Sequence, residues 1–168
     1  MVAWGCPPGK MFFSASLMVQ EVTAMCYVPS SQMNDIQDKN RAIKHFVRTS
    51  LGCACPDQIF EHIRITEHAD MFASASTLYE IGGRLFVAVI DPVDWHDITA
   101  SLDKLVDTGK QYRDQQGYNR FRLVIVTDDD EAVKNLQSVF DALPNIDEKT
   151  HLHVLKPQQL AWNIRPGC

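Results

Sequence analysis

The strongest constraint on the fold is an alternation of strand and helix patterns in the second half of the chain. Residues 84–90 and 121–127 are apolar almost throughout, which is typical of strands that are covered on both faces. Apolar residues at helical spacing follow each of them, over 95–116 and again from Asp128 onward. A last strand is predicted at 151–155. This order predicts right-handed crossovers and a partly parallel sheet.

A glycine pair adds an antiparallel element to this sheet. Gly82 and Gly83 separate two strand patterns, 76–81 and 84–90. Glycine tolerates the positive φ that a two-residue hairpin turn requires. We therefore expect a β-hairpin here, which makes the predicted sheet mixed.

Helical patterns also precede the sheet. Apolar residues recur at helical spacing over 34–51, and a shorter helix with Pro56 at its first position is expected over 56–63. We expect these two helices to form a small attached subdomain or flap. The predicted fold is therefore α/β, a compact two- or three-layer domain with a mixed, partly parallel sheet. Its N-terminal helical segment is expected to carry a Cys-x-Cys motif.

Composition excludes several classes of function. The 168 residues are about one domain's worth, and 45% of them are hydrophobic, enough for a sizeable core. The net charge of −5, from 16 Lys+Arg and 21 Asp+Glu, argues against a general nucleic-acid binder. No stretch reaches the roughly 18 apolar residues of a membrane helix. We expect neither nucleic acid nor membrane as a partner.

The first 32 residues differ in character from the rest, with only two charged residues among them. The apolar run 11–19 has the length of a signal-peptide core but lacks the basic residues that should precede it, so we expect a cytoplasmic protein. Met33 stands directly before the helix-cap pair Asn34 and Asp35. We expect residues 1–32 to be an extension that is flexible or not native, and residues 33–168 to form a single α/β domain.

The most pointed chemical feature is the pair Cys53 and Cys55, followed by Pro56 at the expected entry of a helix. Unpaired amides and the positive end of a helix dipole favour a thiolate, and the nearby side chains of Lys44 and Arg48 act in the same direction. A lowered thiol pKa is what nucleophiles, redox pairs and metal ligands require. The motif therefore predicts a site but leaves its chemistry open.

Three hypotheses remain for the two thiols. As a redox pair they would cycle between dithiol and disulfide, and the small Cys-x-Cys ring favours an easily reduced bond. As metal ligands they would bind zinc or an Fe–S centre. Two ligands are too few, so His62, His68, Cys168 or a second subunit would have to complete the set. In the third hypothesis the cysteines are small hydrophobic residues that only pack.

The segment around the cysteines resembles a motif in small prokaryotic proteins of uncharacterised function. Those proteins carry Gly-Cys-x-Cys-Pro-x-x-hydrophobic-Phe in a similar position, and here Gly52 to Phe60 match it. The resemblance extends over about residues 43–63. It implies that the thiols matter and implies no particular activity.

Other candidates have simpler structural explanations. The acidic residues 128–131 follow a buried strand, where a carboxylate cluster could hold Mg²⁺, but acidic side chains are also favoured at any helix start. His151 and His153 alternate on one strand face and could share a metal, although paired exposed histidines on an edge strand are ordinary. His96 could serve as a base for a cysteine. No phosphate-binding glycine loop and no serine nucleophile elbow is present.

The sequence thus predicts a thiol-dependent function through Cys53 and Cys55, either metal-centre binding or dithiol redox. Whether the chain is an enzyme is left open. The alternative is a non-catalytic interaction or regulatory module with structural cysteines. Another protein is the expected partner, and a homodimer is among the arrangements that the sequence allows.

Overall fold

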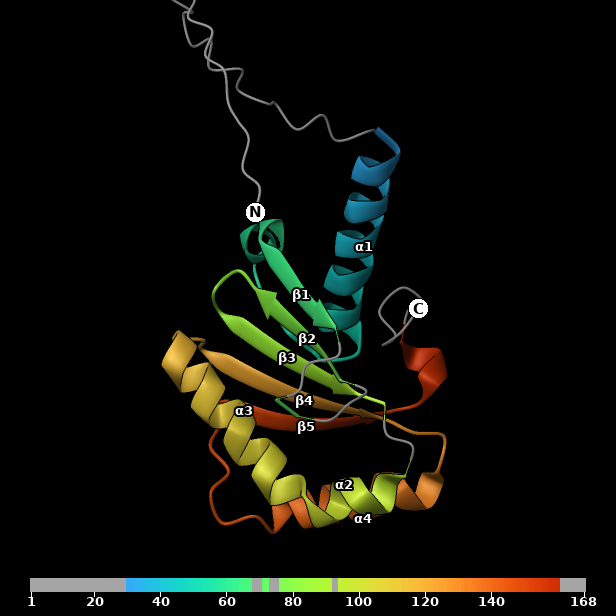
Figure 1. Cartoon of the computed structure of the whole chain (residues 1–168), viewed down its shortest axis with the longest axis vertical. Helices are drawn as coiled ribbons and strands as arrows, with labels where there is room; N and C mark the ends of the chain where they lie inside the picture. The colour runs from blue at the N-terminus through green and yellow to red at the C-terminus, as the bar shows by residue number, and fades with distance from the viewer. Residues whose placement is uncertain (1–29, 68–70, 73–75, 92–93, 161–168) are drawn as a thin grey trace, which may run out of the picture.

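The computed structural model describes residues 30–67, 71–72, 76–91 and 94–160. A five-stranded sheet with the strand order β1-β2-β3-β4-β5 forms the middle layer. Helix α1 lies on one face of this sheet, and helices α2, α3 and α4 lie on the other (Figure 1). The predicted α/β class with a mixed, partly parallel sheet is confirmed, in its three-layer form.

The sheet contains both antiparallel and parallel strand pairs. The five strands are β1 (Ile63–Glu67), β2 (Ser76–Ile81), β3 (Leu85–Ile90), β4 (Arg120–Val126) and β5 (Thr150–Leu155). Strands β1, β2 and β3 pair antiparallel, whereas β3, β4 and β5 pair parallel. Gly82 and Gly83 make the β2–β3 turn with φ of 56° and 61°, which confirms the predicted hairpin. A side chain at Gly82 would also overlap Ile59.

Helix α1 (Ser30–Thr49) is a layer of the domain. Its buried residues Ile43, Phe46 and Val47 belong to one hydrophobic cluster with residues of β2, β3 and β4. The expectation that the N-terminal helices form a separate subdomain or flap is therefore wrong, because the face of the sheet beneath α1 is as apolar as the opposite one and needs a cover. The helix begins at Ser30, three residues before the domain boundary expected at Met33. Residues 1–29 lie outside the described part.

The other face carries α2 (Trp95–Ala100), α3 (Leu102–Gln116) and α4 (Asp130–Asp141). The single helix predicted over 95–116 is interrupted at Ser101, whose φ of −115° and ψ of 8° depart from helical values. Gly109 of α3 packs directly on the Phe121 ring, where a side chain would overlap it. None of the helices in the described residues is both long and apolar enough to cross a bilayer.

The two cysteines lie in an irregular segment between α1 and the next helical turn. That turn, η1, is a 3-10 helix of only five residues (Asp57–Glu61), and the expected α-helix over 56–63 does not form. Pro56 precedes it in an extended conformation, with φ −66° and ψ 154°. The expectation that a helical segment carries the motif is wrong, because the chain must bury Ile59 and Phe60 and then enter β1 at Ile63.

Candidate functional site

Cys53 and Cys55 are joined by a disulfide bond in the structure, with their Cα atoms 5.2 Å apart. Helix α1 ends just before them, and Gly52 turns the chain with a φ of 60°. The Cys53 amide donates a hydrogen bond to the Val47 carbonyl oxygen at 3.1 Å, so the start of the segment is attached to the end of α1.

Basic side chains of α1 hold the other end of the cysteine segment. The Arg48 guanidinium donates to the Cys55 carbonyl oxygen at 2.9 Å and pairs with the Asp57 carboxylate. The Lys44 ammonium lies 2.9 Å from the same carboxylate. Hydrogen bonds from Lys44 and then Arg48 lower the pKa of Asp57. The basic residues that the sequence placed near the thiols thus bind the backbone and Asp57 around them.

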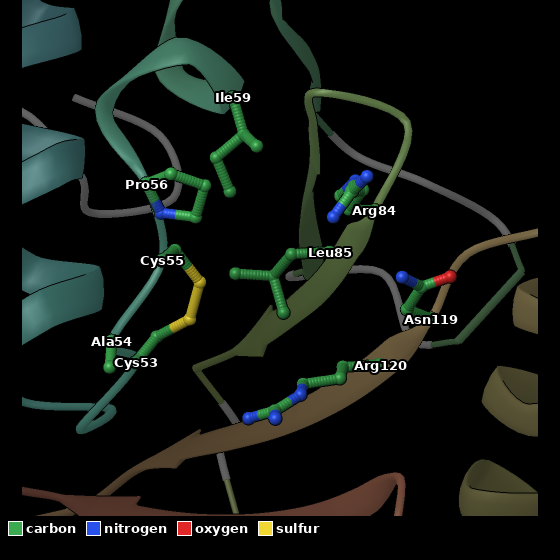
Figure 2. A pocket seen from close by; sticks show the side chains of 9 residues that line it. All are labelled: Cys53, Ala54, Cys55, Pro56, Ile59, Arg84, Leu85, Asn119 and Arg120. Carbon is green, nitrogen blue, oxygen red and sulfur yellow. A yellow bond between two sulfur atoms is a disulfide. The ribbon is translucent and has the colours of Figure 1, made fainter.

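A cavity of about 200 Å³ opens beside the disulfide. Cys53 is buried and only 4% exposed, whereas Cys55 is half-buried. Both line the cavity, together with Leu85, the first residue of β3, and with Arg120, the first residue of β4 (Figure 2). The full lining is Cys53, Ala54, Cys55, Pro56, Ile59, Arg84, Leu85, Asn119 and Arg120. The disulfide is therefore adjacent to an opening and is not sealed under the core.

Three polar residues line this cavity together with the disulfide. Arg84 precedes β3, and Asn119 and Arg120 lie at the start of β4; the Arg120 side chain extends toward Cys53 in Figure 2. The Arg84 carbonyl oxygen accepts hydrogen bonds from the Asn119 and Arg120 amides at 2.8 and 3.1 Å. These bonds hold the two arginine-bearing segments together at one edge of the sheet.

Both arginines are exposed, and neither guanidinium has a hydrogen bond or ion pair with a residue of the described part. The lining contains no carboxylate among the residues that the structure describes. The site is therefore a small cationic pocket with a disulfide in its wall. Sequence reasoning did not find Arg84, Asn119 or Arg120, because each is an ordinary residue at a strand end and only the sheet brings them to the cysteines.

The structure does not unite the predicted metal ligands. His62 lines a different pocket, beside β1, with Arg64 and Tyr118. No group of three or more His, Cys, Asp and Glu side chains in the described ranges is arranged to hold a metal ion. His68 and Cys168 lie outside those ranges. Among the members of the predicted set that the structure describes, Cys53 and Cys55 lie together and His62 lies apart from them.

The acidic residues after β4 have structural partners. Asp129 caps α4 by accepting from the Glu131 and Ala132 amides at 2.7 and 3.2 Å, and these bonds lower its pKa. The Trp95 indole donates to the other Asp129 oxygen at 3.0 Å. Asp130 pairs with Lys156 at 2.8 Å. These contacts agree with the helix-start explanation of residues 128–131.

The remaining histidine candidates also have local partners or are buried. His96 lies 2.8 Å from the Asp94 carboxylate on its own helix cap, and it does not line the cysteine cavity. His151 contacts Arg122 at 2.8 Å through Nδ1. His153 is mostly buried, and burial lowers its pKa to about 4. The edge-strand position of both β5 histidines is as expected, but His153 is not the exposed residue that was predicted.

Fold and site together define an α/β domain with a disulfide-lined cationic pocket at the amino ends of its parallel strands. Comparison of the chain with protein-family models, curated proteins and solved structures found no match.

Proposed function

We propose that Cys53 and Cys55 form a dithiol–disulfide redox pair that exchanges electrons with thiols entering the adjacent pocket. The observation that carries this proposal is the paired sulfur atoms in the wall of an open, cationic cavity. We further propose that the protein works in the cytoplasm, where persistent disulfides are rare and those that form are commonly catalytic or redox-sensing.

The difference in burial between the two cysteines assigns them different roles in this proposal. Both cysteines pack against the core beneath α1, but Cys55 is half-buried, whereas Cys53 is only 4% exposed. An incoming thiolate must reach a sulfur directly. Cys55 is therefore the sulfur that is attacked, and Cys53 is the leaving group.

The surrounding charge supports this division of roles. Thiol–disulfide exchange is faster when the leaving thiolate is stabilised, and cationic neighbours lower thiol pKa values. Arg84 and Arg120 line the same cavity as Cys53 and have no carboxylate partner in the described residues. Their charge is thus available to a thiolate that forms there.

The proposed reaction balances in two steps. A thiolate attacks Sγ of Cys55, and the electron pair of the broken sulfur–sulfur bond passes to Sγ of Cys53. A second thiolate then attacks the outer sulfur of the mixed disulfide and releases the Cys55 thiolate. The two incoming thiols are oxidised to a disulfide, and their two protons pass to Cys53 and Cys55.

A variant that keeps only these two cysteines tests the proposal. Replacing Cys6, Cys26 and Cys168 by serine leaves Cys53 and Cys55 as the only thiols of the chain. This protein is equilibrated anaerobically in dithiothreitol buffers of stepped potential, and the free thiols are trapped by alkylation and counted by mass spectrometry. We expect reversible titration of two thiols per chain with a two-electron slope. The matched variant that also carries Cys55→Ser should show none.

Two results would replace the proposal with an alternative. Stoichiometric zinc or iron in the anaerobically purified protein, lost with Cys53→Ser, would establish the metal-centre function instead. Thiols that become reactive only on unfolding would mean that the cysteines are structural. In that case the interaction module, with another protein or a second copy as its partner, would be the better account.

A further inference from the structure

We infer that the pocket beside the disulfide selects a small thiol that carries a carboxylate. The inference rests on the proposed redox function and names its substrate class. The juxtaposition that carries it is two arginines without a partner in the described residues and a side-chain amide, all lining the same small cavity as a disulfide.

The charges of the pocket favour an anion. Arg84 and Arg120 are the charged residues of the described lining, and both are positive. The chain as a whole carries a net charge of −5, so an anion gains nothing from the protein's overall charge. A local concentration of positive charge in a concave site attracts anions and accelerates their association. This pocket is therefore a cationic exception on an acidic protein.

The chemistry of the side chains narrows the anion to a carboxylate or a group of similar shape. A guanidinium presents N–H donors in a planar fork that matches the two oxygens of a carboxylate. The Asn119 side-chain amide also lines the cavity and can add one further donor. Hydrogen bonds from the backbone amides of Asn119 and Arg120 to the Arg84 carbonyl oxygen hold together the two backbone segments that carry these side chains.

The size of the cavity favours a small molecule over a protein segment. Its volume of about 200 Å³ is below the roughly 300–1,000 Å³ of sites that enclose drug-sized ligands. A molecule of a few heavy atoms can place its carboxylate at Arg84 and Arg120 while its sulfur reaches Cys55. The same geometry serves the reverse reaction, in which a carboxylate-bearing disulfide is reduced and Cys53 and Cys55 are oxidised.

Reduction of the oxidised protein by small thiols of different charge tests the inference. The probes are 3-mercaptopropionate, 2-mercaptoethanol and cysteamine, which carry −1, 0 and +1 charges, and each rate is divided by the thiolate concentration. We expect the anionic thiol to react about tenfold faster than the neutral one, and the advantage should shrink in 0.5 M salt. Cysteamine should be the slowest.

Matched variants test whether Arg84 and Arg120 cause the faster reaction of the anionic thiol. In the double variant Arg84→Gln/Arg120→Gln the anionic and neutral thiols should react at equal normalised rates, whereas the charge-retaining Arg84→Lys/Arg120→Lys should keep part of the preference. Arg41→Gln removes one positive charge from an exposed position on α1 outside this pocket and should leave the ratio unchanged. Because the ratio compares two thiols on one protein, a general loss of thiolate stabilisation does not alter it.

The possible results distinguish failure of the substrate inference from failure of the proposed redox function. Equal rates for anionic and neutral thiols on the unaltered protein would overturn the inference and leave the redox proposal standing. An acidic cysteine-containing peptide that reacts faster than 3-mercaptopropionate would also overturn it, in favour of a protein segment. Failure of every thiol to reduce the Cys53–Cys55 bond would instead overturn the proposed function.

Discussion

The two faces of the sheet satisfy their buried polar groups very differently. On the face covered by α2, α3 and α4, the buried Glu80 carboxylate accepts from Arg64, Tyr112 and Tyr118. On the same face, Arg113 pairs with Asp147. On the face covered by α1, three buried polar atoms have no hydrogen-bond partner in the described residues. They are Thr77 Oγ1, Arg122 Nε and His153 Nε2.

The cysteine pocket lies on the less satisfied face. Phe86 and Phe121, together with Tyr112 and Tyr118, form a continuous set of ring contacts on the α2–α4 face. The α1 face has one helix to cover the same sheet, and it contains both the disulfide and the unpartnered cations. Unsatisfied buried groups in native proteins gather at functional sites. Among the described residues, the α2–α4 face thus satisfies its buried polar groups more completely, whereas the α1 face carries the pocket for which we propose redox chemistry.

Substitution of Gly109 tests how rigid the α2–α4 face is. Gly109→Ala places a methyl group against the Phe121 ring, and overpacking of a filled core destabilises by about 1–3 kcal/mol. An exposed helical glycine would instead gain about 1 kcal/mol from the same change. Urea unfolding of the oxidised protein measures the difference, with the exposed Gln111→Ala on the same helix as control. A stabilised variant would show that this face can repack.

Two buried arginines on opposite faces provide the sharpest contrast. Arg113 and Arg122 are 3% and 4% exposed, but only Arg113 has carboxylate partners among the described residues. Arg113→Met leaves Asp147 without its cationic partner and should cost about 3 kcal/mol. Arg122→Met should change the free energy of unfolding by less than about 1 kcal/mol. Similar losses in both variants would contradict the contrast between the faces.

The pH dependence of the Arg113 variant gives a second readout. Hydrogen bonds from Arg113 hold the pKa of Asp147 well below its ordinary value. A carboxylate whose pKa is lowered on folding stabilises above its ordinary pKa and loses that contribution as the pH falls. The difference between the unaltered protein and Arg113→Met should therefore narrow between about pH 5 and pH 3.

His153 should make the α1 face sensitive to mild acid. Burial, then the charge of Arg122, lowers its pKa from 6.5 to about 4. The unfolded chain binds this proton more tightly than the folded chain does. The contribution of neutral His153 to the free energy of unfolding is therefore retained above pH 6.5, and this free energy should fall by about 2 kcal/mol as the pH drops toward 4.

His153→Leu should flatten that slope, and Arg122→Met should move its midpoint to higher pH. The exposed His45→Gln on α1 is the control. An unchanged slope in His153→Leu would assign the acid sensitivity to other groups. Melting temperatures at a series of pH values provide the measurement.

The smallest predicted effects come from two buried threonines. Thr77 Oγ1 has no hydrogen-bond partner in the described residues, whereas Thr150 Oγ1 contacts Arg113 and Asp147. Thr77→Val should stabilise the protein by up to about 1 kcal/mol, because it removes an unsatisfied hydroxyl, and Thr150→Val should destabilise it by about 1–2 kcal/mol. Equal signs in the two urea-unfolding experiments would contradict the comparison of the faces.

Local pattern was sufficient for much of the fold. The apolar strands, the Gly82–Gly83 turn and the helix after β4 depend on side-chain periodicity and on the φ preferences of single residues. These act over a few positions. The conformation of the segment after α1 was harder to predict, because Pro56 is compatible with both an α-helix and a 3-10 turn. The need to bury Ile59 against Gly82 favours the shorter form.

By itself the sequence determined four of the five strands (all except β1), their order along the chain and the presence of two thiols two residues apart. Only the tertiary structure decided what surrounds those thiols. Arg84 and Arg120 lie more than 30 positions after Cys53 in the sequence. They reach the pocket because β3 and β4 pair side by side. Strand pairing is a long-range contact, so no local pattern around the cysteines encodes it. Conversely, His62 is only nine positions from Cys53 in the sequence but lines a different pocket.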